Sequence, residues 1–357
     1  MLVLKTNEIM KLYDQPWRYY HNKTHLNTML DKAVGMLVNQ PFTSGGALEN
    51  AAKRVVENEE FDVLKTAIVF HDCVYEPERN DNEEKSSEMW MKFSEGKGVP
   101  DDFVREVSEL ILSTKHPEDC KTKLEVILRN LDWNFMGETH EITPEYGRWL
   151  ASYEDGVFRE YQKFPIWDEK APNYVKGRLD FLSSSVSKGL MTKEVADFLR
   201  PLVLRKKTVG IYAGSFNPFH VGHLNVLRKA EQMFDKVIVG RGVNAEKKGI
   251  AKSEYDNLEK VLRHHQVESY SGQLVEYVDS KRNAYCEPVL VRGLRNGYDL
   301  DYEMRLVSFM NEQADARKIR RIPVVYVHSD KEYEHISSSA IRTLEPIDAE
   351  RYIPNEQ

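Results

Sequence analysis

The spacing of apolar positions changes once along the chain, near residue 206. Before this point apolar positions recur every three and four residues, which is the spacing of one face of a helix. Three such runs are Leu26, Met29, Leu30, Val34 and Leu37; Leu64, Ala67, Ile68 and His71; and Leu124, Ile127, Leu128 and Leu131. Polar turns at residues 42–46 and 75–84 interrupt them, and we find no run of alternating strand character. Residues 1–205 are therefore predicted to form an all-α domain.

Short β-branched runs begin after this point. They lie at residues 208–212, 236–240, 288–293 and 322–327, with amphipathic segments between them. Strands that alternate with helices predict a parallel sheet covered by helices, so residues 206–357 are expected to form an α/β domain. The boundary is placed at residues 204–207, where a helical segment ends in basic residues. The two predicted domains are thus 1–205 and 206–357.

Composition narrows the class of protein. The 357 residues are 41% hydrophobic and 30% charged, which suits two ordinary cores. A formal net charge of -7, and no interleaved basic and aromatic stripe, disfavour a nucleic-acid partner. The three cysteines form no CxxC pair and favour a reducing compartment. There is no signal-peptide core and no apolar run near the roughly 18 residues of a membrane span, so a cytoplasmic, non-membrane protein is expected.

The strongest chemical signal is the segment GIYAGSFNPFHVGHLNVLRKA, residues 210–230. A strand enters a glycine-containing turn, and an amphipathic helix follows. The free N–H groups and the dipole of that helix start favour a phosphate. His220 and His223 flank Gly222 there, so two imidazoles are available to donate hydrogen bonds to phosphate oxygens. The alternative interpretation is that the two histidines only cap the helix.

Two later segments also suit phosphate. In VRGLRNGYDLDYE, residues 291–303, Arg292 and Arg295 follow a strand end, where ligands gather in open α/β sheets. Asp299 and Glu303 lie one turn apart on the next helix, so a surface salt-bridge network is the alternative. In HISSSAIR, residues 335–342, a serine run enters a helix and offers hydroxyls and unpaired N–H groups. By itself this last segment is only an N-cap.

Together these three segments resemble the HxGH nucleotidyltransferases, most closely the phosphopantetheine adenylyltransferases, over about residues 206–357. The resemblance implies a Rossmann-like fold, ATP with Mg²⁺, a phosphorylated small-molecule acceptor such as 4′-phosphopantetheine, and a homo-oligomer. It implies catalytic roles for Ser215, His223 and Arg292, and for Lys247 or Lys248 at the acceptor phosphate. The implied ATP-binding residues are Gly214, Ser215, Phe216, His220, His223, Arg292, Gly293, Arg295, Asp299, Glu303, Ser337, Ser338 and Ser339.

The sequence constrains the identity of the acceptor less than it constrains the type of transfer reaction. Asn217 stands where the family usually has aspartate, and HVGH stands where a TxGH-type segment is common. GSFNPFHVGH is equally similar to a nicotinamide mononucleotide adenylyltransferase segment, so that acceptor is the alternative. The VRGLR and DYE segments and the triple serine favour phosphopantetheine. Cytidylyl transfer is disfavoured, because those enzymes usually carry a different C-terminal signature.

In the helical domain, polar residues recur where helices face inward. His71 and Asp72 end one predicted helix, His25 lies on an earlier one and Asp132 on a later one. Two histidines and two aspartates from separate helices suit a divalent metal with open positions for water and a phosphate. Adjacent His-Asp pairs are more often structural, so the surrounding residues decide the interpretation.

The segments YHN with His25, AIVFHD, DNEE, LD with NFMG, REY (159–161) and GR (177–178) resemble the HD-superfamily metal-dependent phosphohydrolases over about residues 13–205. The resemblance implies that His25, His71, Asp72 and Asp132 bind a divalent transition metal such as Mn²⁺, Fe²⁺, Co²⁺ or Ni²⁺. Candidate substrate-site residues are His21, Glu83, Glu84, Lys115, His116 and Arg178. The sequence thus predicts a bifunctional enzyme; the alternative is an adenylyltransferase with a non-catalytic, nucleotide-sensing HD module.

Overall fold

The computed structural model describes residues 7–36, 58–133, 142–243 and 257–355. It divides into two compact units, Met1–Glu160 with Leu179–Leu202, and Tyr161–Arg178 with Val203–Gln357. The division falls inside two helices, α9 (Tyr174–Ser187) and α10 (Lys193–Leu204). Residues 161–178, which the change of periodicity assigns to the N-terminal domain, are therefore grouped with the second unit. The domain limits 1–205 and 206–357 stay a prediction.

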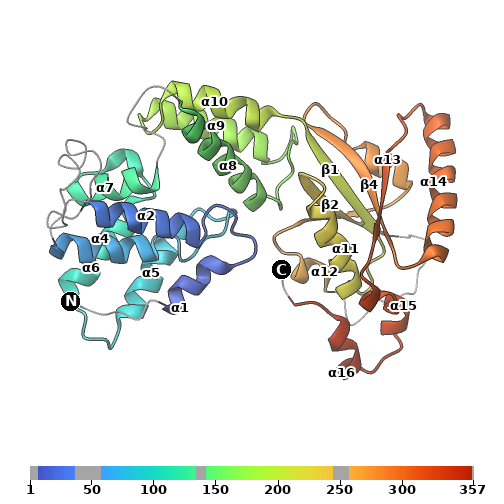
Figure 1. The fold of residues 1–357 in the computed structure, drawn as a ribbon, viewed down its shortest axis with the longest axis horizontal. Coiled ribbons are helices and arrows are strands. Elements are labelled where there is room, and N and C mark those ends of the chain that lie inside the picture. Colours follow the sequence, from blue (N-terminus) through green and yellow to red (C-terminus); the bar gives the residue numbers. More distant parts are fainter. Residues whose placement is uncertain (1–6, 37–57, 134–141, 244–256, 356–357) are drawn as a thin grey trace. The chain divides into compact units, whose positions relative to one another are not determined.

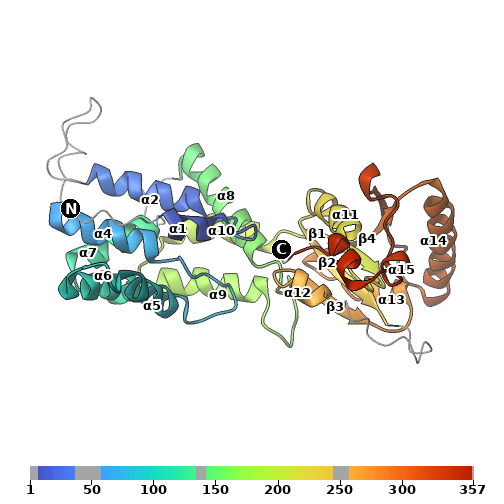
Figure 2. The ribbon, with the colours of Figure 1, turned by 90° about the horizontal axis from the view of Figure 1, so that it is seen from below.

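The described residues of the first unit are helical, as the periodicity predicts, and none of the helices described in the chain is long and apolar enough to cross a membrane. Besides parts of α9 and α10, its helices are α1 (Asn7–Met10), α2 (Lys23–Gly35), α4 (Asn58–Phe70), α5 (Asn82–Ser94), α6 (Asp101–Ser113), α7 (Lys123–Asp132) and α8 (Pro144–Glu160) (Figures 1 and 2). Local signals begin two of them. Asn22 accepts hydrogen bonds from the first backbone N–H groups of α2, and Thr122 with Glu125 forms a capping box on α7. That these helices form an HD-type domain stays a prediction.

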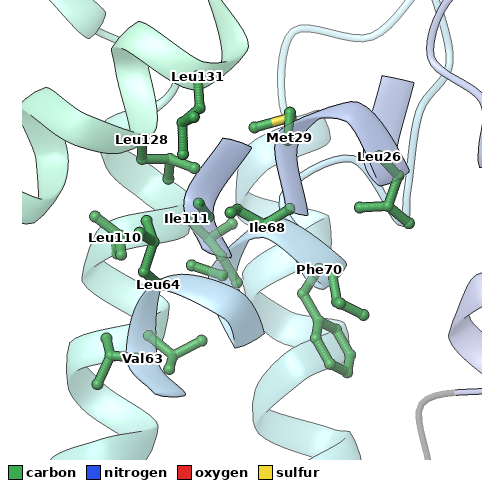
Figure 3. Packing of buried hydrophobic residues seen from close by; sticks show 14 of the residues in the cluster. Leu26, Met29, Val63, Leu64, Ile68, Phe70, Leu110, Ile111, Leu128 and Leu131 are labelled. Atoms are coloured by element: carbon green, nitrogen blue, oxygen red, sulfur yellow. The ribbon is translucent and has the colours of Figure 1, made fainter. Parts of the chain in front are cut away.

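The predicted apolar faces make the core of the first unit. Leu26 of α2, Leu64 and Ile68 of α4, Ile111 of α6 and Leu128 of α7 are completely buried and belong to one cluster (Figure 3). Burial of each such side chain contributes about 1.5–3 kcal/mol. This packing fixes α2, α4 and α7, and so fixes the polar side chains that these helices carry at the edge of the core.

The second unit contains a parallel five-stranded sheet in the order β3-β2-β1-β4-β5. Its strands are β1 (Lys207–Gly214), β2 (Lys236–Gly242), β3 (Gln266–Tyr270), β4 (Cys286–Leu294) and β5 (Val324–His328). The Rossmann-like parallel sheet is thus confirmed, and four of the strands are the predicted β-branched runs; β3 was not predicted. The strand order reverses direction between β1 and β4, which in open α/β sheets marks the ligand-binding crevice.

Helices cover both sides of this sheet. The helices α11 (Val221–Glu231) and α12 (Leu258–Val261) lie on one side, and α13 (Leu274–Asp279) and α14 (Gly297–Arg317) lie on the other (Figure 1). This arrangement follows from right-handed crossovers that run outward from β1 to β3 and then back through β4 to β5. Two short helices, α15 (Ser338–Ile341) and α16 (Pro346–Ala349), follow β5.

A buried lysine ties residues 161–178 to the sheet. Lys236, at the start of β2, is 2% exposed, and its ammonium donates to the carbonyl of Phe164 at 2.5 Å and to that of Gln162. Burial lowers the pKa of Lys236 to about 7. These contacts explain why the segment is grouped with the second unit, although its sequence is continuous with the helical half.

Candidate active sites

The turn after β1 is held by aromatic packing. Phe216 has φ 47°, in the left-handed region, and its buried ring meets the rings of Tyr212 and Phe219. A Cβ at Gly214 would approach the Phe216 ring to 2.9 Å, so only glycine fits there. The turn therefore has one conformation, which places Ser215 beside the carboxyl end of β1 and His220 at the start of α11.

His220 and His223 cap α11 reciprocally. The backbone N–H of each donates to Nδ1 of the other at 3.3 Å, and the two rings stack with centroids 3.6 Å apart. Because each Nδ1 accepts, each neutral ring carries its proton on Nε2. Burial, helped by the charge of Arg295, lowers the pKa of His220 to about 4, and burial with His220 and Arg295 also lowers the pKa of His223 well below its usual value. Near neutral pH the pair therefore consists of two uncharged hydrogen-bond donors.

A cavity of about 330 Å³ opens at this helix start, between the ends of β1 and β4. All of the predicted ATP-binding residues except Ser339 line it. Sequence reasoning missed several lining residues, among them Tyr302, Tyr333 and Ser329. The Oγ of Ser329 is buried without a hydrogen-bond partner. Its position directly after β5, at the carboxyl end of a strand, was the signal that would have found it.

The two arginines of this cavity are paired with carboxylates. Arg292 donates to both oxygens of Glu303, at 2.6 and 2.7 Å, and to the carbonyl of Ala213 at 2.6 Å. Arg295 donates to both oxygens of Asp299 at 2.9 Å. The pairing that the sequence offered as an alternative is therefore present, and it lies inside the cavity. Direct contact between either arginine and a triphosphate stays a prediction.

Glu303→Gln is expected to destabilise the second unit by about 3 kcal/mol, because it removes the buried carboxylate charge that faces the half-buried guanidinium of Arg292. The midpoint and slope of urea unfolding would measure this. Asp301→Asn is the matched control. This change breaks the ion pair between Asp301 and Arg305, whose side chains are 69% and 79% exposed, respectively. It should change stability by less than about 1 kcal/mol. Equal losses in both variants would contradict a special role for the Arg292–Glu303 pair.

The serine segment is fastened to the turn after β1. Ser337 caps α15, and the Ser338 hydroxyl donates to the carbonyl of Pro218 at 2.9 Å. Arg342 donates to the carbonyl of Asn217 and to Ser339. Ser337 and Ser338 thereby reach the cavity, whereas Ser339 faces away from it into this contact. The predicted acceptor lysines, Lys247 and Lys248, lie outside the described residues.

The second unit is expected to lose stability as the pH falls from about 6.5 to about 4. In this range an unfolded histidine binds a proton, while His220 in the folded chain remains neutral. The unfolded state therefore binds more protons than the folded state. As the pH decreases, the free energy of unfolding decreases by up to about 3 kcal/mol for this residue. His220→Asn retains a cap acceptor without titrating, so urea unfolding of that variant should show a shallower pH dependence. His223 and His264, whose pKa values are also lowered, change stability in the same direction. An unchanged slope in His220→Asn would contradict this assignment.

Comparison with known proteins agrees with this geometry. Residues 211–344 match the cytidylyltransferase-like family. The phosphopantetheine adenylyltransferase of Clostridium perfringens is 32% identical over 155 residues, which cover 42% of this chain and 89% of the relative. That of Clostridium botulinum is 31% identical over 139 residues, which cover 38% of this chain and 79% of the relative. Through its C-terminal domain, the chain belongs to the phosphopantetheine adenylyltransferase family. The domain is therefore an adenylyltransferase, and the cavity over His220 and His223 is its candidate nucleotide site.

A second candidate site lies in the first unit, where His25, His71, Asp72 and Asp132 come together. One ligand atom from each lies within 4.8 Å of the others. Asp132 Oδ1 is 3.2 Å from His25 Nε2 and 3.8 Å from His71 Nε2, and Asp72 Oδ2 is 3.0 Å from His71 Nε2. The helices α2 and α7 and the end of α4 thus direct the four predicted ligands to one point.

The donor set fits a divalent cation. The Nε2 atoms of His25 and His71 are buried and face the carboxylates of Asp132 and Asp72 at 3.2 and 3.0 Å, without the geometry of a hydrogen bond. Nδ1 of His71 lies 2.8 Å from the carbonyl of Ile68, so the ring proton is held there and Nε2 keeps its lone pair for a metal. Burial opposes a charge on His71, yet Asp72 and Asp132 raise its pKa well above the usual value. The two carboxylates therefore favour positive charge at this point, which is what a bound cation supplies.

Two buried charged residues support this cluster. The guanidinium of Arg18 donates to the carbonyls of Asp72 at 2.7 Å and His21 at 3.1 Å. The carboxylate of Glu160 accepts from the backbone N–H groups of Tyr20 and His21 and lies 2.7 Å from His21 Nδ1. Neither residue was predicted as a site residue, although Glu160 lies in the REY segment of the resemblance. The burial of the Glu160 carboxylate would have indicated a role at the site, and the sequence does not reveal that burial.

The predicted substrate residues of this unit divide into two groups. His21 stacks on Tyr75 with ring centroids 4.0 Å apart. Burial lowers the pKa of His21, but Glu160 and the cluster residues Asp72 and Asp132 raise it above its usual value. Glu83 is half-buried, and burial, helped by the charge of Asp72, raises its pKa. Both residues thus lie within electrostatic reach of the cluster. Glu83 occupies the first turn of α5, which corrects the predicted loop at this position.

The other four have different surroundings. Glu84, also in the first turn of α5, forms an ion pair with Lys115. The side chain of His116 is 65% exposed and lies outside the metal cluster. Arg178 is buried and is grouped with the second unit. Roles for these four residues in substrate binding stay predictions.

Proposed function

We propose that the C-terminal domain transfers the adenylyl group of ATP to 4′-phosphopantetheine, giving dephospho-coenzyme A and pyrophosphate. The observation that carries the proposal is the neutral His220–His223 pair at the edge of the cavity. Two uncharged Nε2–H groups bind phosphate oxygens without repelling the Mg²⁺ that accompanies ATP. The relatives named as phosphopantetheine adenylyltransferases support this acceptor.

In the proposed reaction, a phosphate oxygen of the acceptor attacks the α-phosphorus of ATP in line. The bond to the bridging oxygen breaks and pyrophosphate leaves, so no covalent enzyme intermediate is needed. The Nε2–H groups of His220 and His223 stabilise charge on the phosphate oxygens. The hydroxyls of Ser215 and Ser337 donate to the triphosphate, while Ser338 holds the serine segment to the turn after β1. Catalysis in this scheme consists of positioning and charge stabilisation.

The acceptor is tested by incubating the full chain with ATP and Mg²⁺ and either 4′-phosphopantetheine or nicotinamide mononucleotide. Pyrophosphate release with the first acceptor, with dephospho-coenzyme A identified by mass spectrometry, is the expected result. Release only with nicotinamide mononucleotide would overturn the acceptor and leave adenylyl transfer in place. If neither acceptor leads to pyrophosphate release, other phosphorylated acceptors should be tested.

We further propose that the N-terminal domain is a metal-dependent phosphohydrolase. The observation that favours it is the cluster of His25, His71, Asp72 and Asp132, whose two buried Nε2 atoms make no well-formed hydrogen bond. A divalent cation held by these four residues would supply positive charge for the phosphoryl oxygens and would lower the pKa of water. Water then adds to phosphorus and the ester P–O bond breaks. The proton removed from water is passed to the leaving oxygen, so an alcohol and inorganic phosphate are released. Glu83, with its raised pKa, is suited to orient that water and take its proton.

Metal analysis tests this second proposal. The full chain produced with Mn²⁺ should retain about one metal ion per chain after dialysis, by the chemistry of the donor set. Chelation should abolish phosphoester hydrolysis, and Mn²⁺, Fe²⁺, Co²⁺ or Ni²⁺ should restore it. A chain that holds the metal but hydrolyses no phosphoester in a panel of nucleotides and cofactor phosphates would instead be a sensing module.

A further inference from the structure

The chain just after α4 carries two of the four metal-ligand candidates, at the point where the hydrogen bonds of the helix stop. The backbone N–H of His71 still donates to the carbonyl of Ala67 at 2.8 Å, whereas Asp72 and Cys73 lie beyond the last helical turn. Their carbonyls accept instead from the guanidinium of Arg18, at 2.7 and 3.2 Å. Backbone groups past a helix end take their position from partners outside the helix. The position of Asp72 therefore depends on Arg18.

The same guanidinium also holds the turn before α2. Its Nη1 atom donates to the carbonyl of His21 at 3.1 Å as well as to that of Asp72. The helix α2 begins two residues after His21, at Lys23, and carries His25. Arg18 thus joins the segment that carries Asp72 to the segment that leads to His25, so one side chain relates two metal-ligand candidates.

The guanidinium is itself fixed. Arg18 is 5% exposed, and its Nε donates to the side chain of Gln15 at 2.8 Å. Its central carbon lies 5.1 Å from the ring centroid of Tyr13 and 5.6 Å from that of Tyr75. Within the described part of the chain, no carboxylate forms an ion pair with Arg18, so its partners are carbonyls, one amide and two rings. These contacts use the N–H directions of a planar fork, which an ammonium group does not reproduce.

Arg18 approaches the cluster from the interior of the unit. A cavity of about 370 Å³ adjoins the cluster, and His25, Asp132 and Trp149 are among the described residues that line it. Arg18 and Asp72 do not belong to that lining as far as the structure describes it. The guanidinium therefore reaches the cluster through the backbone, and it is not placed to touch a molecule that enters the cavity.

We propose that Arg18 is a positioning residue for the metal centre. Its guanidinium holds Asp72 at the separation from His25 and Asp132 that a single cation requires. The inference rests on the proposed metal-dependent phosphohydrolase function and names the residue that sets the geometry of that site. Replacement of groups that orient metal ligands weakens metal binding by about 10- to 100-fold. Because the contact is geometric, a positive charge alone does not replace it.

Mn²⁺ binding to the full chain tests this inference without turnover. The metal-free chain is titrated with Mn²⁺, and free Mn²⁺ is measured by electron paramagnetic resonance. Arg18→Lys, which keeps the charge and loses the fork, should raise the Kd for Mn²⁺ by about tenfold or more. In Arg18→Ala, added methylguanidinium should restore part of the affinity, and methylammonium should not. Arg148→Lys is the matched control, because that side chain is 71% exposed on α8 of the same unit, and it should leave the Kd unchanged.

A spectroscopic signature separates positioning from a general loss of stability. With Co²⁺ in excess, the visible absorption of the bound ion reports the arrangement of its ligands. The spectrum should differ between the original chain and Arg18→Lys, and it should be unchanged in Arg148→Lys. If the Arg18 variants do not fold, Gln15→Met, which removes only the acceptor of Nε, should still raise the Kd for Mn²⁺ by about two- to tenfold.

The outcomes separate the two claims. A Kd in Arg18→Lys within about twofold of the original value, or in Gln15→Met where the Arg18 variants do not fold, would overturn the positioning role while the metal site stands. Rescue of Arg18→Ala by methylammonium as well as by methylguanidinium would show that only charge matters, and would overturn it too. Metal binding that depends on Arg18, in a chain that hydrolyses no phosphoester, would support this inference and overturn the phosphohydrolase function. A chain that binds no divalent cation would overturn both.

Discussion

Replacement of His223 by alanine is expected to lower kcat for adenylyl transfer by about 10²- to 10³-fold, the usual effect of losing one fixed donor to a transition-state oxygen. The Nε2–H of His223 is a neutral donor in a half-buried position, and its Nδ1 accepts from the backbone N–H of His220. Alanine removes both functions. Steady-state pyrophosphate release at saturating ATP and acceptor measures the loss. His223→Gln, which retains an amide donor, should recover part of the rate.

Two controls make this result specific. His328→Ala removes a histidine whose side chain is 57% exposed in the same unit, and it should leave transfer unchanged. Hydrolysis by the first unit should also be unaffected in His223→Ala, since the two sites share no residue. If His223→Ala retains transfer within about threefold of the original chain while folding normally, the pair is only a helix cap and the proposed donor role is wrong.

The sheet illustrates what periodicity reveals and what it misses. Strands β1, β2 and β4 are largely buried, so their β-branched runs stand out in the sequence. The strand β3 reads QVESY and lies at the edge of the sheet, where only Gln266 is buried. An edge strand of five residues with a glutamate and a serine has neither a continuous apolar run nor a clear alternation. The unit to which residues 161–178 belong could not be predicted from periodicity either, because the contacts of Lys236 with residues 162 and 164 are tertiary.

The site shows the same division between local and tertiary information. The reciprocal cap of His220 and His223 spans three residues, so the sequence placed both histidines correctly at a helix start. The pairing of Arg292 with Glu303 depends on how α14 returns across β4, so the sequence offered a salt-bridge network here without showing which arginine pairs with which carboxylate. No sequence pattern pointed to Trp149, because its ring contact with Tyr146 on α8 and the cavity that it lines together with residues of α2 are tertiary features.

Replacement of Asp132 by asparagine is expected to remove the metal ion and phosphoester hydrolysis together. Its Oδ1 faces both imidazoles of the cluster, and the substitution preserves shape while deleting one of the two negative charges. Changes in residues that merely support a ligand already weaken metal binding by about 10- to 100-fold, so loss of a ligand charge should exceed that range. Metal content after dialysis measures the first effect, and release of inorganic phosphate measures the second.

Stability gives an independent readout of the same change. A ligand at 100 times its Kd stabilises the folded state by about 2.7 kcal/mol, so metal should raise the thermal midpoint of the original chain and not that of Asp132→Asn. Asp155→Asn is the matched control, since that side chain is 54% exposed and pairs only at the surface with Arg159. It should bind metal, hydrolyse phosphoester and respond to metal normally. Metal-induced stabilisation that survives in Asp132→Asn would exclude this cluster as the metal site. Loss of metal with retained hydrolysis would place the hydrolytic site elsewhere in the chain.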